Sequence, residues 1–172
     1  DIPSIQSQLM RAAIVVTDPS DWTAQALLAS FSRKGIIADF INFKDLIASI
    51  NGQPSFRCAG LDLEELDAIL VRDLGRSGVS DVAFRFETLI ALQERGVAVI
   101  NPPPAIARAA NKFATSLALQ RAGVPTPRTA VTTSLMEAQA ALHDLGRAVS
   151  KPLFGFKGRE IFLLHDGVQR SE

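Results

Sequence analysis

The stretch Lys151-Pro-Leu-Phe-Gly-Phe-Lys-Gly-Arg159 joins two predicted strands and decides how the fold of this chain is interpreted. Its two glycines, three residues apart, allow backbone N–H groups to approach an anion without an intervening side chain. Lys157 and Arg159 add positive charge, and Lys151 enters the loop from the preceding strand. The pattern predicts a loop that closes over phosphates. Two glycines and two cations between strands also suit an ordinary hairpin turn, so this alternative stays open.

Short apolar runs alternate with segments of helical periodicity before this stretch. This order is typical of βαβ units and predicts an α/β fold with a mostly parallel sheet. Strands are expected over 12–18, 36–43, 67–73 and 97–100, and helices over 19–34, 44–50 and 82–95. Gly35 is expected to end the first of these helices. Ligands gather at the carboxyl ends of parallel strands, where this chain carries Asp18, Arg72, Asp73 and Asn101.

The run Asn101-Pro-Pro-Pro104 predicts a stiff connector, because proline neither continues a strand nor fits a helix interior. We therefore expect one domain over 1–101 and a second over 102–172. The second domain is predicted to contain helices over 105–122, with a break near Asn111, and over 134–145, the last with Ser134 as its cap. Strands are expected over 128–133, 148–153 and 161–164.

Composition favours a soluble globular protein, with 47% hydrophobic and 21% charged residues. Eighteen basic residues balance eighteen acidic ones, so neither nucleic acid nor a membrane is expected as a partner. The single cysteine, Cys58, excludes an internal disulfide. No spanning segment or secretion signal is recognised, and we predict a cytoplasmic location.

Several common sites are not supported by the sequence. There is no Gly-x-x-x-x-Gly-Lys-Ser/Thr loop and no Gly-x-Gly-x-x-Gly turn. His143 and His165 have no partners at metal-ligand spacing and are expected at the surface. We assign no catalytic and no metal-ligating residue.

Five segments resemble, in order, the motifs of the RimK-like ATP-grasp amino-acid ligases. They are Asp67-Ala-Ile-Leu-Val-Arg-Asp73, Asn101-Pro-Pro103, Asn111-Lys112-Phe113, Leu119-x-x-Ala-Gly-Val-Pro-Thr-Pro-Arg-Thr129 and Lys151-Pro-Leu-Phe-Gly-x-x-Gly158. The resemblance covers only the N-terminal part of that family. It implies a Rossmann-like pre-ATP-grasp domain with a mostly parallel sheet, followed by an incomplete ATP-grasp subdomain of the α+β type.

The resemblance also implies roles for individual residues. The residues expected to bind ATP are Lys112, Lys151, Gly155, Lys157 and Gly158. Arg72 is expected to contact a substrate carboxylate. Asn111 stands where many members of the family have Asp, and it can still cap a helix. The Mg²⁺ ligands are expected beyond Glu172, so this chain alone is expected to lack ligase activity.

The implied reaction is ATP-dependent joining of a carboxylate and an amine through an acyl phosphate. The amine is expected to be glutamate or another amino acid, and the acceptor a pterin cofactor such as tetrahydromethanopterin or a protein carboxylate. Two alternatives remain open, namely a non-catalytic nucleotide-binding module and a protein-interaction module. A half-built ATP-grasp subdomain would expose apolar surface, which favours a homo-oligomer or a further partner segment.

Overall fold

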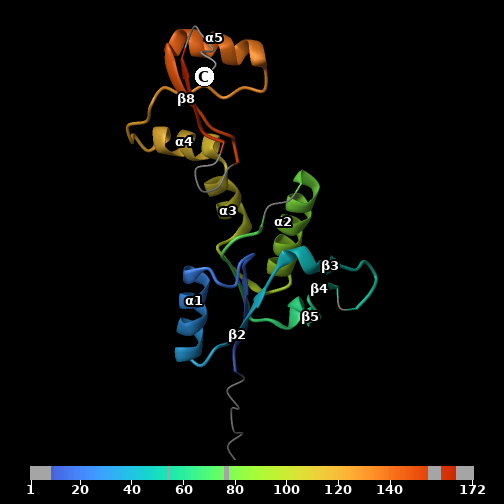
Figure 1. Cartoon of the computed structure of the whole chain (residues 1–172). Helices are drawn as coiled ribbons and strands as arrows, with labels where there is room; N and C mark the ends of the chain where they lie inside the picture. Colours follow the sequence, from blue (N-terminus) through green and yellow to red (C-terminus); the bar gives the residue numbers. More distant parts are fainter. Residues whose placement is uncertain (1–8, 54, 76–77, 155–159, 166–172) are drawn as a thin grey trace, which may run out of the picture. The chain divides into compact units, whose positions relative to one another are not determined.

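The computed structural model describes residues 9–53, 55–75, 78–154 and 160–165. The chain divides into two compact units, residues 1–103 and residues 104–172 (Figure 1). No described helix is both long and apolar enough to span a bilayer.

The first unit is built on a four-stranded sheet in the order β2-β1-β6-β7, in which every neighbouring pair is parallel. The strands are β1 (Arg11–Val15), β2 (Ile37–Ile41), β6 (Ala68–Val71) and β7 (Ala98–Ile100). The α/β prediction with a parallel sheet is therefore confirmed. The connection from β1 to β2 runs toward one edge of the sheet and the connection from β6 to β7 toward the other. The point where the strand order reverses lies between β1 and β6.

Helices α1 (Trp22–Arg33) and α2 (Val79–Glu94) make these two connections. Because crossovers are right-handed and the two run in opposite directions, the helices cover opposite faces of the sheet (Figure 1). The side chain of Asp21 caps α1 by accepting the N–H of Ala24 at 3.0 Å. Gly35, with φ of 71°, ends this helix as predicted.

The hydrophobic core lies on both faces of the sheet. Ala13 and Val15 pack in one cluster with Leu89 and Leu92 of α2, and Ile14, which points to the opposite face, is also fully buried. Among the described residues, the buried apolar side chains of the core are Ala12, Ala13, Ile14, Val15, Val16, Ala24, Ile41, Phe43, Cys58, Leu63, Leu66, Ile69, Leu89, Leu92, Val97 and Val99, and Pro103 is also fully buried.

A small antiparallel sheet, in the order β3-β4-β5, extends the first unit. It consists of β3 (Leu46–Ala48), β4 (Phe56–Cys58) and β5 (Leu61–Asp62), flanked by the 3₁₀ turns η1 (Phe43–Asp45) and η2 (Leu63–Glu65). The helix predicted over 44–50 is therefore wrong. Asn42 caps a single turn through the N–H of Lys44, and the following residues pair with β4 instead of continuing the turn.

The second unit contains α4 (Lys112–Arg121), α5 (Leu135–Leu145) and an antiparallel pair, β8 (Arg147–Ser150) and β9 (Phe162–His165). Helix α3 (Pro103–Ala110) leads into this unit. The predicted break near Asn111 and the predicted strand pair are confirmed. So is the Ser134 cap, whose hydroxyl accepts the N–H of Glu137.

Two predictions for this half are wrong. Pro103 and Pro104 begin α3 rather than forming a connector, because the first turn of a helix needs no N–H donor. Residues 128–133 form no strand, since β8 and β9 pair with each other and the described residues offer 128–133 no partner. Thr129 instead donates its hydroxyl to the carbonyl of Pro127 at 2.9 Å.

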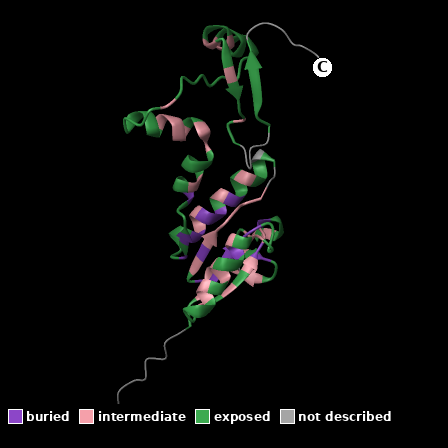
Figure 2. Ribbon diagram, turned by 60° about the vertical axis from the view of Figure 1, so that its left-hand side comes forward, coloured by how far each residue is buried: buried purple, intermediate pink, exposed green. Residues whose placement is uncertain are grey.

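Burial differs sharply between the two units. Every buried residue in the described part of the chain lies between residues 12 and 103, and Figure 2 shows this as purple confined to the first unit. Described residues after 103 are intermediate or exposed, and Leu135, Met136 and Phe162 expose 75%, 78% and 60% of their surface. The second unit therefore has no closed core of its own within the described residues.

Candidate functional site

Lys112 is the first residue of α4, and the structure places its backbone against the segment that follows β8. Its N–H donates to the carbonyl of Leu153 at 3.1 Å. Asn111, directly before it, caps the helix by accepting the N–H of Ala114 at 3.0 Å. The prediction that Asn111 caps a helix is therefore confirmed. The contact brings Lys112 to the segment that begins with Lys151, so two of the predicted ATP-binding residues lie in one region of the second unit.

The ammonium group of Lys112 is buried. Within the described residues, its Nζ is the buried side-chain nitrogen that has no hydrogen-bond partner. An ammonium removed from water without an acceptor is costly, so such groups normally face an anion. A phosphate would supply both the charge and the acceptor oxygens that this nitrogen lacks.

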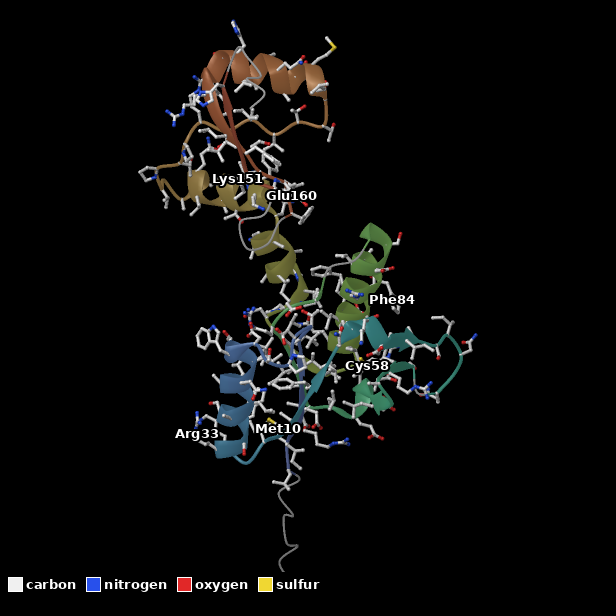
Figure 3. The ribbon with its side chains drawn as sticks, in the orientation of Figure 1. Met10, Arg33, Cys58, Phe84, Lys151 and Glu160 are labelled. Atoms are coloured by element: carbon white, nitrogen blue, oxygen red, sulfur yellow. The ribbon has the colours of Figure 1, made fainter. Side chains whose placement is uncertain are left out.

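Lys151 follows β8 directly and is exposed. Figure 3 shows it at the same end of the strand pair as Glu160, which precedes β9. Because Lys151 is exposed at the start of the connection between β8 and β9, a ligand can reach its ammonium directly from solvent. The predicted ATP-binding residues Gly155, Lys157 and Gly158 lie outside the described residues.

A broad hollow lies between α4 and the extended segment that follows it, which the sequence did not reveal. Its volume is about 470 Å³. The lining residues are Phe113, Ser116, Leu117, Gln120, Thr126, Pro127, Arg128, Thr129 and Val131. Mixed polar and apolar linings of this size are typical of ligand sites and of packing surfaces alike. Its apolar lining residues from α4, Phe113 and Leu117, are four positions apart and lie on one face of the helix. This spacing was the signal in the sequence from which the hollow could have been predicted.

Arg72, predicted to bind a substrate carboxylate, forms a bidentate ion pair within the first unit. Its Nε and Nη2 donate to the two carboxylate oxygens of Asp21 at 3.0 and 2.9 Å. The N–H of Ala24, foremost, and the Arg72 guanidinium lower the pKa of Asp21, while burial opposes them. Asp21 therefore both caps α1 and holds Arg72, a role that its sequence position alone does not reveal.

Three other polar residues were expected at the carboxyl edge of the sheet. Asp73 accepts the N–H of Gly75 at 3.0 Å and that of Thr17 at 3.3 Å. Asp18 accepts both the N–H and the hydroxyl of Ser20, at 2.9 and 2.6 Å. Asn101 follows β7 and is exposed. Asp18 and Asp73 thus organise the turns that follow β1 and β6.

Cys58 is buried in the core, and its thiol donates to the carbonyl of Asn42 at 3.2 Å. Burial, reinforced by the charge of Asp45, raises the pKa of this thiol to about 11. His143 and His165 are exposed, as predicted. The described residues contain no group of three or more acidic, His or Cys side chains placed to hold a metal ion.

Comparison with known proteins connects these observations to a family. The chain is 39% identical over 164 residues to tetrahydromethanopterin:alpha-L-glutamate ligase of Methanosarcina acetivorans, covering 92% of this chain and 51% of the relative. The protein of the same name from Methanocaldococcus jannaschii is 35% identical over 147 residues, covering 86% of this chain and 49% of the relative. The chain thus spans about half the length of the curated relatives that it matches. No family model matches it.

Solved structures agree on the fold. A RimK domain ATP-grasp protein from Sphaerobacter thermophilus matches with a TM-score of 0.68 at 22% identity, covering 91% of this chain and 54% of that protein. The ATP-grasp ligase PsnB, in complex with a variant of its minimal precursor, Mg and ADP, matches with a TM-score of 0.61 at 22% identity, covering 92% of this chain and 58% of that protein. Sequence and fold together relate this chain to the N-terminal part of the RimK-like ATP-grasp ligases.

Proposed function

We propose that this chain is the N-terminal portion of an ATP-dependent carboxylate–amine ligase that adds glutamate to a tetrahydromethanopterin-type acceptor. The names of the two curated relatives support this choice of amine and acceptor. In this proposal, the domain predicted over 1–101 is the pre-ATP-grasp domain and the domain predicted over 102–172 is the first part of the ATP-grasp domain. A protein carboxylate is the alternative acceptor.

The buried, unpartnered ammonium of Lys112 is the observation that carries the proposal. It fits a nucleotide phosphate, which would complete the charge balance at the start of α4. Lys151 would add a second cation from the segment that contacts Lys112, and Gly155, Lys157 and Gly158 would close over the phosphates. Phosphoryl transfer depends on positioning and charge neutralisation, to which both lysines would contribute.

In the proposed reaction, a substrate carboxylate attacks the γ-phosphorus of ATP, giving an acyl phosphate and ADP. The amine then attacks the acyl carbon and releases phosphate. Bound Mg²⁺ would neutralise further phosphate charge, and the relative solved with Mg and ADP supports its involvement. We place the Mg²⁺ ligands outside residues 1–172. The loop 155–158 would protect the acyl phosphate from water.

The test combines nucleotide binding with product formation in the full-length protein. We expect Lys112→Ala and Lys151→Ala each to weaken ATP binding by roughly 10- to 100-fold, as for the loss of one charge-assisted phosphate contact. The control is Lys34→Ala, since Lys34 is an exposed lysine that follows α1. Calorimetry measures the affinity, and mass spectrometry detects the glutamylated acceptor.

Unchanged ATP affinity in the Lys112→Ala, Lys151→Ala double variant would overturn the nucleotide assignment. ATP binding without any glutamylated product would favour a nucleotide-binding module. The exposed apolar residues after position 103 favour a protein-interaction module as the second candidate. If the protein is an interaction module, both lysine substitutions should leave its binding to the partner protein unaffected.

A further inference from the structure

The carboxyl edge of the parallel sheet in the first unit carries an arginine, Arg72, whose guanidinium has hydrogen-bond donors left over after its ion pair with Asp21. Arg72 directly follows β6, at the point between β1 and β6 where the strand order reverses. Open α/β sheets bind ligands at such switch points, because the helices and loops on either side diverge there.

The pairing geometry of Arg72 leaves one edge of its guanidinium available. Asp21 occupies the side formed by Nε and Nη2, at 3.0 and 2.9 Å. A guanidinium has five N–H groups, and a second bidentate edge lies between Nη1 and Nη2. The hydrogen bonds of the described residues leave that edge unused, and 27% of the Arg72 side chain is exposed.

The carboxylates near Arg72 do not exclude a further anion. Asp73 accepts two backbone N–H groups, and Asp18 accepts the N–H and hydroxyl of Ser20. Hydrogen bonds of this kind direct the negative charge toward local donors and partly neutralise it. Asp21 is itself paired with Arg72 and caps α1.

We propose that the Asp21–Arg72 pair is a preorganised receptor for a substrate carboxylate, in which Asp21 orients Arg72 and the free guanidinium edge binds the carboxylate. The inference rests on the proposed ligase function, which requires two carboxylate-bearing substrates, glutamate and the acceptor. Arg72 is the binding residue, and Asp21 is a positioning residue. Holding the fork in advance lowers the entropy lost when the carboxylate binds.

The experiment uses Arg72→Lys and Asp21→Asn in the full-length protein. Lysine keeps the charge but loses the planar fork, and asparagine keeps an oxygen that can cap α1 but loses the charge that holds Arg72. The control is Arg33→Lys, an exposed arginine at the opposite end of α1 (Figure 3). Calorimetry with L-glutamate and with tetrahydromethanopterin, with and without a non-hydrolysable ATP analogue and Mg²⁺, measures the affinity of each.

We expect Arg72→Lys to weaken the binding of one of these two compounds by about 10- to 100-fold and Asp21→Asn by about 3- to 10-fold, with Arg33→Lys unchanged. The compound affected identifies the carboxylate. In the ligase assay the same compound should show a raised KM at nearly constant kcat.

A purely structural ion pair would lower Tm in both variants and leave both affinities at the wild-type value, which would overturn the inference. Failure of the wild-type protein to bind either compound would overturn it too. Binding that depends on Arg72 in a protein that forms no glutamylated product would refute the ligase proposal but retain the carboxylate receptor.

Discussion

At the scale of single residues, Lys112 is expected to destabilise the ligand-free protein and, in our proposal, to strengthen the binding of ATP. Its buried Nζ has no partner among the described residues. We expect Lys112→Met, which keeps the apolar stem and removes the charge, to raise the stability of the ligand-free protein by about 1 kcal/mol. The same change should abolish the proposed phosphate contact, so ATP should raise Tm less than in the wild type.

Thermal unfolding with and without ATP measures both effects. Lys151→Met is the matched control for the ligand-free stability alone, because Lys151 is exposed and its charge is solvated. If Lys112→Met instead lowered the stability of the ligand-free protein, the prediction would be wrong, because the protein itself would then be stabilising the buried ammonium.

Cys58 provides a second prediction at this scale. Because the pKa of its thiol is raised to about 11, the thiolate is scarce at pH 8 in the folded protein. We expect the native thiol to react with iodoacetamide at least about a hundredfold more slowly than after unfolding in urea. Since Cys58 is the single cysteine of the chain, the rate of labelling also reports opening of the first unit. Rapid labelling of the native protein would contradict its burial.

At the scale of elements, the connection from β6 to α2 depends on Gly75. Its φ is 77°, and a Cβ there would lie 2.8 Å from Cγ2 of Thr17 and 3.3 Å from Nη1 of Arg85. We expect Gly75→Ala to destabilise the protein by about 2–4 kcal/mol, through backbone strain and displacement of these neighbours. Urea unfolding measures the loss.

Gly35→Ala separates the two causes. Gly35 has a similar φ of 71°, but an added Cβ would meet no atom within 4 Å. This substitution should cost only about 1 kcal/mol, from backbone strain alone. Equal losses at the two glycines would show that the contact with Thr17 relaxes easily.

The start of α1 should make stability depend on pH. The N–H of Ala24 and the guanidinium of Arg72 lower the pKa of Asp21 in the folded protein. A carboxyl group with a lowered pKa stabilises the fold above its unfolded pKa of about 3.9, and this contribution is lost as the pH falls through the folded value. We expect Asp21→Asn to lower Tm at pH 7 and to lower it less at pH 3, where the Asp21 carboxylate is partly protonated in the wild type. A difference that grows toward acid pH would contradict this assignment.

At the scale of the whole molecule, stability should be divided between the two units. The buried side chains of the described residues all lie between positions 12 and 103. In hydrogen exchange of the 172-residue chain, we expect slow amides in β1 and β6 and much faster ones in β8 and β9. Mass spectrometry of peptic fragments resolves these segments. Equal protection would indicate that the exposed apolar side chains of the second unit are covered in solution, for example by a second copy of the chain.

The sequence alone determined the features that depend on near neighbours in the chain. Apolar runs gave the strands of the parallel sheet, Ser134 and Asn111 were recognised as helix caps, and Gly35 as a helix end. These signals are local, because periodicity, capping and a positive φ each involve only a few successive residues. The prediction that Lys112 and Lys151 bind ATP came from motifs of the same short range, and it stays a prediction. The loop 155–158 stays a prediction.

The tertiary structure alone decided the features that join distant segments. Residues 46–48 became a strand because β4 offered them a partner. Residues 128–133 did not, because no strand among the described residues pairs with them. The Arg72–Asp21 pair spans 51 positions, and Lys112 reaches the carbonyl of Leu153 across the second unit. Burial of the Lys112 ammonium likewise follows from packing. Such contacts depend on which segments the fold brings together, and a residue's own sequence neighbourhood contains no record of that.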